Sequence, residues 1–166
     1  MKYDVAHVLL RVSPARCAEI FFDPAFAQAM KSAAGTKSLE VLERDDDGAR
    51  VRRRMRIVPE RGVPAPFRAM VRGEIAIVEE SVFDRAALCV TWRSVPTVLT
   101  EKLELSGTTT FRAVESGVER RIAGEVRVRV AGVGAMIERM LVSDLTAAQG
   151  RIARFAQEWI DREAGA

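Results

Sequence analysis

The sequence predicts an α+β fold in which one antiparallel sheet packs against a long C-terminal helix. Three observations predict it. Runs with the two-residue period of β-strands fill most of the region 37–130. Short turns join these runs without an intervening helix, which favours an antiparallel meander. From about 133 to 162 the apolar residues switch to a helical period. No linker divides the 166 residues, so we expect a single domain over 1–166.

The first elements are a strand and two short helices. The strand is predicted over Tyr3–Val12. Ser13 and Pro14 are typical of a helix N-cap and a first helical position, and we expect this helix to end at Phe22. An Asp-Pro pair then begins another short helix, from Pro24 to about Ala34, which a glycine ends.

Six further strands and one helix follow. The strands are expected at 37–44, 49–59, 74–83, 87–95, 101–114 and 118–130, so the sheet has about six or seven strands. The Asp-Gly pair at 47–48 indicates a hairpin, and this turn explains the adjacent aspartates at 45–47 better than a metal site does. The apolar stripe of the last helix recurs every three or four residues: Ile137, Leu141, Leu145, Ala148, Ile152, Phe155 and Trp159.

The composition is that of a soluble globular protein, with 48% hydrophobic and 30% charged residues. No apolar run approaches the roughly 18–20 residues that a membrane-spanning helix needs. The N-terminal segment MKYDVAHVLLRVSP carries an acidic residue and lacks the pattern of a signal peptide. Cys17 and Cys89 have neither metal-binding nor redox spacing. We therefore expect a cytoplasmic protein with two reduced cysteines.

Arginines crowd the segment Arg50–Arg56, and the net charge is +3. The two-residue period of a strand places Arg50, Arg52, Arg54 and Arg56 on one face. No aromatic residues accompany them as stacking platforms for nucleotides. We interpret this face as solvated and paired with acidic residues of neighbouring strands, and we expect no nucleic-acid partner.

Arg53 falls among the apolar residues of the same strand, where an unpaired charge is costly. Three explanations are open: a bulge turns it outward, a carboxylate pairs with it, or it faces a polar part of a cavity. In the last case its guanidinium is a natural anchor for an anionic ligand group. Glu79 and Glu80 are adjacent, so one of them points inward in a regular strand and could pair with Arg53 or act as a general base.

The sequence contains no catalytic motif. The single histidine, His7, lies inside the first strand and is best interpreted as a packed wall residue. No Cys, His, Asp or Glu constellation has ligand spacing, and no glycine-rich phosphate loop occurs. We therefore predict no catalytic residue, no metal site and no cofactor.

The element order resembles that of the START-like superfamily, which includes polyketide cyclases and Bet v 1-like proteins. The resemblance covers essentially the whole chain. It rests on the opening strand, the paired short helices "SPARCAEIFFDPAFAQAM", the meander and the final helix. The tail "VAGVGAMIERMLVSDLTAAQGRIARFAQEWI" and the segment "PERGVPAPFRAMVRG" are similar to an uncharacterised bacterial branch. The resemblance implies a helix-grip fold, with a curved sheet around the long helix and a hydrophobic cavity between them.

Apolar residues on the expected inner surfaces are candidates for the cavity wall. With Arg53, the candidate ligand-binding residues are Met55, Ile57, Trp92, Phe111, Met136, Ile137, Met140 and Leu141. Phe67 and Met70 in the proline-rich segment form a possible lid over the cavity. Packing of the core alone is the competing interpretation of each of these residues.

The function predicted first is binding or transport of a hydrophobic or amphipathic small molecule, lipid- or polyketide-like. A small cyclase, dehydratase or hydrolase using the same pocket is the alternative, and a ligand-free interaction module is a third class. The expected partner is the small molecule, with at most a transient membrane contact. No pattern in the sequence specifies the ligand's identity or the oligomeric state.

Overall fold

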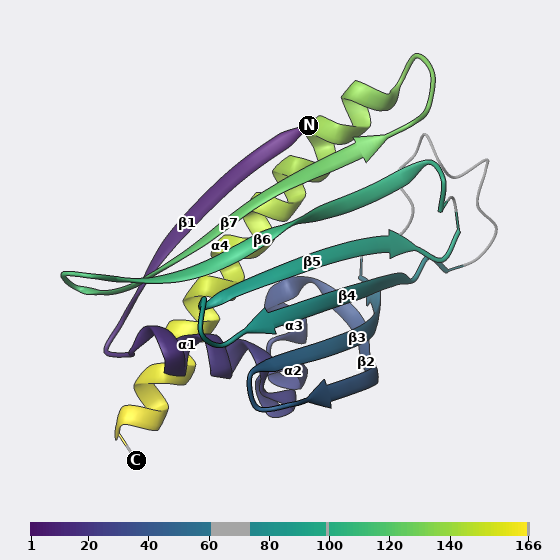
Figure 1. The fold of residues 1–166 in the computed structure, drawn as a ribbon. Helices are drawn as coiled ribbons and strands as arrows, with labels where there is room; N and C mark the ends of the chain where they lie inside the picture. Colours follow the sequence, from purple (N-terminus) through teal and green to yellow (C-terminus); the bar gives the residue numbers. More distant parts are fainter. Residues whose placement is uncertain (61–73, 99, 166) are drawn as a thin grey trace.

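The computed structural model describes residues 1–60, 74–98 and 100–165, and it confirms the α+β architecture (Figure 1). A seven-stranded antiparallel sheet has the order β1-β7-β6-β5-β4-β3-β2. The elements are β1 (Lys2–Leu10), α1 (Pro14–Phe22), α2 (Pro24–Ala29), α3 (Lys31–Ala34), β2 (Thr36–Asp46), β3 (Arg50–Pro59), β4 (Ile77–Asp84), β5 (Cys89–Pro96), β6 (Leu103–Val114), β7 (Gly117–Val128) and α4 (Gly134–Gly165). All six pairings are antiparallel, so β1 alone leaves the hairpin order by lying beside β7.

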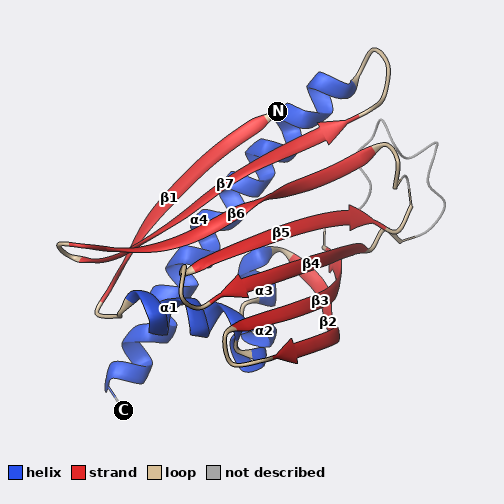
Figure 2. Cartoon of the chain, in the orientation of Figure 1, coloured by secondary structure: helices blue, strands red, loops and turns tan. Residues whose placement is uncertain are grey.

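Helix α4 packs on β1 and β7 and crosses behind them in the view of Figure 2. Its polar side chains fasten it to both ends of this part of the sheet. Gln157 accepts a hydrogen bond from the Leu10 amide at 2.7 Å, and Glu138 accepts one from the Val128 amide at 2.9 Å. The helix is therefore held at two points almost twenty residues apart, with the inner face of the sheet beside it.

The short helices begin where the sequence predicts. The Ser13 hydroxyl caps α1 by accepting from the Arg16 amide at 3.2 Å, and the Asp23 carboxylate caps α2 by accepting from the Ala25 amide at 2.7 Å. The predicted second helix is in fact two, because Met30 ends α2 and begins α3. Gly35 ends α3 in the left-handed conformation, at φ 69°.

The aspartates at the end of β2 and in the following turn build the predicted hairpin. Asp47 accepts hydrogen bonds from the Ala49 and Arg50 amides at 2.9 and 2.7 Å, and Gly48 has φ 86°. Asp46 accepts a hydrogen bond from the Gly48 amide at 3.1 Å and also forms an ion pair with Arg85 at 2.6 Å, and Arg85 pairs with Glu19 of α1 at 2.6 Å. These carboxylates therefore fix the turn and tie it to the rest of the fold.

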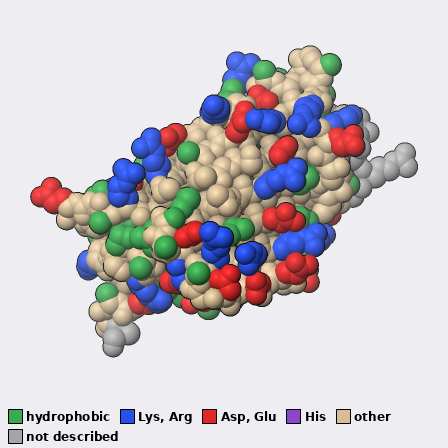
Figure 3. Space-filling view, in the orientation of Figure 1, with side chains coloured by type: hydrophobic (Ala, Val, Ile, Leu, Met, Phe, Trp, Pro, Cys, Tyr) green, Lys and Arg blue, Asp and Glu red, His purple; other side chains and the backbone are tan. Residues whose placement is uncertain are grey.

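The outer face of the sheet carries the predicted charge pairs. Arg50 pairs with Asp84 at 3.1 Å, and Arg93 pairs with Glu104 at 2.9 Å. In the space-filling view of Figure 3, basic and acidic side chains are interspersed over this face. Isolated exposed pairs of this kind stabilise a protein only slightly, so their main effect is to keep this face solvated.

The apolar core is divided into three clusters. The largest joins α1, α2 and the C-terminal half of α4 to the sheet around Phe26 and Phe83. A second lies around Met55 on β3, and a third surrounds Ile137 near the start of α4. Between the first and third clusters, Leu145, Ala148 and Gln149 in the middle of α4 are only half-buried. This division positions the candidate site.

Candidate functional site

One row of residues crosses the inner face of the sheet from β3 to β1, and we call it the central row. Register pairs each member with the next, in the order Arg53, Ser81, Trp92, Gly107, Gly124 and Tyr3. Trp92 is only half-buried, although it lies on a central strand flanked on both sides. The indole packs against the largest apolar cluster, and part of it remains in contact with solvent.

Two glycines in the central row make room for two rings. A Cβ atom at Gly107 would lie 2.7 Å from Cζ2 of Trp92 and 2.3 Å from the Ala123 carbonyl oxygen. A Cβ atom at Gly124 would lie 2.7 Å from Cζ of Tyr3. Real Cβ atoms do not approach so closely, so the indole and phenol rings occupy the space that side chains would take. On the opposite, outer face of the sheet, a shallow hollow of about 540 Å³ lies over these glycines, lined by residues such as Ser106 and Glu125.

Arg120 of β7 points into the interior and is 7% exposed. Its Nη1 donates to Oε1 of Gln149 on α4 at 2.9 Å, and its guanidinium lies 4.2 Å from the centre of the Phe21 ring. Its Nε has no hydrogen-bond partner among the described residues. Burial lowers the pKa of Arg120 to about 10, so the group remains a cation at neutral pH.

Arg53 approaches the same region on the same inner face, from β3 near the other edge of the sheet. The register between β3 and β4 is regular through Arg53, so the explanation by an outward-turning bulge is wrong. Nη1 of Arg53 donates to the Phe21 carbonyl at 3.2 Å, one of the carbonyls that the end of α1 leaves unsatisfied. The guanidinium lies 4.3 Å from the centre of the Phe22 ring, and Nε has no partner among the described residues.

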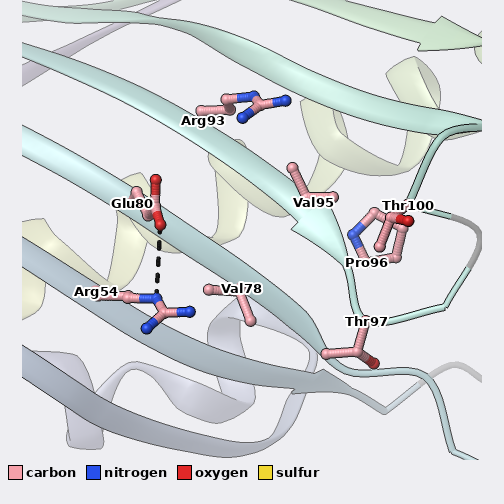
Figure 4. Close-up of a pocket in the computed structure, with 8 residues that line it drawn as sticks. All are labelled: Arg54, Val78, Glu80, Arg93, Val95, Pro96, Thr97 and Thr100. Carbon is pink, nitrogen blue, oxygen red and sulfur yellow. Dashed lines mark ion pairs between the residues drawn. The ribbon is translucent and has the colours of Figure 1, made fainter.

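Glu79 is the inward member of the adjacent glutamates. It pairs in register with Met55 and Ser94, and the Ser94 hydroxyl donates to it at 3.4 Å. Burial raises the pKa of Glu79, and the nearby positive charge of Arg53 opposes this effect only in part. Glu80 points outward and pairs with Arg54 at 3.5 Å, beside a surface pocket of about 210 Å³ (Figure 4).

Tyr3 and His7 complete what we call the interior polar cluster. Its members are Tyr3, His7, Arg53, Glu79, Arg120 and Gln149. Burial raises the pKa of Tyr3 to about 12 and lowers that of His7, so both are neutral at pH 7. Nδ1 of His7 has no partner among the described residues. Two guanidinium groups thus face one carboxyl group in this cluster.

The structure separates the predicted wall residues into two groups. Met55, Phe111 and Ile137 are buried, and Ile57, Trp92 and Leu141 pack against the apolar clusters. Met136 and Met140 are 53% and 38% exposed, so their expected inward orientation is wrong. Each precedes a stripe residue by one position, and a step of one residue turns the side chain by about 100° around the helix. Phe67 and Met70 lie outside the described residues.

Sequence reasoning did not identify Arg120 or Gln149. A signal for Arg120 existed, because it alternates with Val118 and Ile122 on the apolar face of its strand. Gln149 gives no comparable signal, since a glutamine beside an apolar stripe is common.

In the described ranges 1–60, 74–98 and 100–165, no group of His, Cys, Asp and Glu side chains could hold a metal ion. No described helix has the length and apolar content to cross a membrane.

The sheet, the long helix and the short helices after β1 together form a helix-grip fold. The sequence belongs to a family described as protein of unknown function DUF2505, whose model matches residues 6–160. No curated protein matches the chain in sequence.

Solved structures share this fold at low sequence identity. The protein TTHA0849 from Thermus thermophilus is 16% identical, with a TM-score of 0.68 over 94% of this chain and 97% of that one. A START superfamily protein from Mycobacterium smegmatis is 11% identical, with a TM-score of 0.63 over 96% and 97% of the two chains. The di-domain ARO/CYC protein StfQ of the steffimycin biosynthetic pathway is 13% identical, with a TM-score of 0.59. This chain is 98% covered in that match and spans 47% of StfQ.

Proposed function

We propose that this protein binds a hydrophobic or amphipathic small molecule, lipid- or polyketide-like, between the central row and α4. The observation that carries the proposal is the indole of Trp92, which packs against the largest apolar cluster and yet stays half-buried on a central strand. A protein without a ligand gains most by covering such an aromatic ring fully with its own side chains. The START-like fold, which includes StfQ among its structures, supports the same conclusion.

Native mass spectrometry of protein purified from a bacterial host, followed by organic extraction, tests this proposal. A discrete bound mass that dissociates on extraction is the expected result. A second measurement uses Trp159→Phe, which leaves Trp92 as the only indole. Saturable changes in its emission on titration with amphiphiles such as dodecanol are expected. Absence of both a bound mass and a saturable change would refute binding in this interior.

Catalysis in the same interior is a second candidate, and one observation favours it. Glu79 is a carboxyl group with a raised pKa beside two arginines, which suits a general acid or base. The test is incubation of the extracted ligand with wild-type protein and with Glu79→Gln. Catalysis predicts a product with the wild type and none with the variant, whereas an unchanged ligand in both samples excludes it.

A further inference from the structure

The interior polar cluster has an excess of positive charge. Arg53 and Arg120 contribute two cations, and Glu79 contributes at most one anion. Tyr3 and His7 are neutral, and the buried thiol of Cys17 has a pKa raised to about 11. The described part of the interior therefore holds at least one uncompensated positive charge. Burying such a charge is costly unless a partner neutralises it.

The described contacts of the two guanidinium groups are with neutral partners. Arg120 donates to the Gln149 amide oxygen, and Arg53 donates to the Phe21 carbonyl. Each also lies over a phenyl ring, Phe21 or Phe22, which shields one face of the guanidinium. In both, the buried Nε is without a partner among the described residues. Two cations with spare donors are thus held in place by neutral groups, and the described part of the interior supplies too little negative charge for them.

We propose that the ligand is an amphipathic monoanion, a carboxylic acid with an apolar body, and that Arg120 and Arg53 hold its carboxylate. This inference rests on the proposed function. A carboxylate matches the planar fork of a guanidinium. With Glu79 ionised the excess is one positive charge, which one carboxylate matches, whereas a phosphate monoester carries about −1.5 to −2 at pH 7. The indole of Trp92, on the central row with Arg53, provides an apolar surface for the body of the ligand.

A pair of ligands that differ only in the charged group tests this inference. Dodecanoic acid and dodecanol share one chain, and isothermal titration at pH 7 compares their affinities for the full chain. We expect the acid to bind about 10-fold more tightly or better, the equivalent of a charge-assisted hydrogen bond. Equal affinities would overturn the assignment of an anion while leaving the proposed function intact. Binding of neither ligand would count against both.

Two variants locate the anion within the interior. Arg120→Met and Arg53→Met keep similar apolar length, and each is expected to remove most of the preference for the acid. Arg121→Met and Arg54→Met are the matched controls, because these neighbours point outward and pair with Asp4 and Glu80. Circular dichroism establishes that each variant is folded. An undiminished preference in both folded interior variants would refute the proposed site, and so would an equal loss in the controls.

The charge match has a test of its own. Dodecyl phosphate has the same chain with a larger charge, and we expect it to bind more weakly than dodecanoic acid at pH 7. Tighter binding of the phosphate would overturn the assignment of a carboxylate.

Discussion

Trp92 and Gly107 are register partners on β5 and β6, and the indole occupies the position where a side chain at 107 would begin. The Ala123 carbonyl oxygen crowds the same position at 2.3 Å. Together the two contacts fix a flat aromatic surface on the inner face of the sheet. The half-buried interior therefore depends on a residue that makes no side-chain contact itself.

Gly107→Ala is expected to destabilise the protein by about 1–3 kcal/mol, because the new methyl group forces the indole or the backbone to move. Thermal unfolding followed by circular dichroism measures the change. Gly165→Ala is the control, since a Cβ atom there meets no atom within 4 Å. If Gly107→Ala left the protein as stable as the wild type, Trp92 would not lie over this glycine.

Two substitutions of Gln149 are expected to change both the stability of the protein and its affinity for an anion. Gln149→Leu removes the acceptor of a buried charged donor and should cost about 1.5–3 kcal/mol in the free energy of unfolding. Gln149→Glu places a carboxylate there instead. We expect it to be more stable than Gln149→Leu and to bind dodecanoic acid more weakly than the wild type, because the positive charge is already compensated. Chemical denaturation and titration calorimetry measure the two effects, and tighter binding by the glutamate variant would contradict this explanation.

Glu79 is expected to make stability depend on pH. Its pKa in the folded protein is raised above that of an unfolded chain, about 4.3. The folded state therefore retains a proton that the unfolded state releases. The stability that this difference in pKa contributes is fully present below the pKa of the unfolded chain. It is lost as the pH rises through the folded pKa. The melting temperature of the wild type relative to Glu79→Gln should accordingly fall with rising pH. Glu80→Gln, on the outer face, should produce no such trend, and a flat difference for Glu79→Gln would refute the prediction.

Ile137 and Met140 should respond very differently to truncation. Ile137 is completely buried, so Ile137→Ala is expected to cost about 2–5 kcal/mol. Met140 is 38% exposed, and Met140→Ala should change the stability by no more than about 0.5 kcal/mol. Urea denaturation of both variants provides the measurement. A comparable loss in the two would place Met140 inside the core after all.

The fold could be predicted from sequence because its signals are local. Alternation, an Asp-Gly turn and a capped helix start each act within a few residues, and the strand of Arg53 has the predicted inner face. Which of Glu79 and Glu80 points inward could not be predicted, because the strand alternates with the same two-residue period in either case. In the structure, Glu79 pairs in register with Met55 on the inner face, and this pairing fixes its inward orientation.

The candidate site was harder to predict because its members are distant in the chain. Arg120 meets Gln149 and Phe21 only after β7, α4 and α1 have packed together. A buried arginine also contradicts the usual link between charge and exposure, so the alternation that places it inward is easily overlooked. The predicted inward orientation of Met136 and Met140 was wrong for a geometric reason. Helical spacing identifies the apolar stripe, but it does not separate the stripe from residues at its margin.

The two glycines of the central row differ in what surrounds them. The space at Gly107 is closed partly by backbone atoms of Ala123 and Gly124, which no substitution elsewhere can remove. At Gly124, the three atoms nearest to an added Cβ atom all belong to the side chain of Tyr3. Across the DUF2505 family, position 107 is therefore expected to be invariant. Position 124 should instead covary with position 3, gaining a side chain wherever the tyrosine is replaced by a smaller residue.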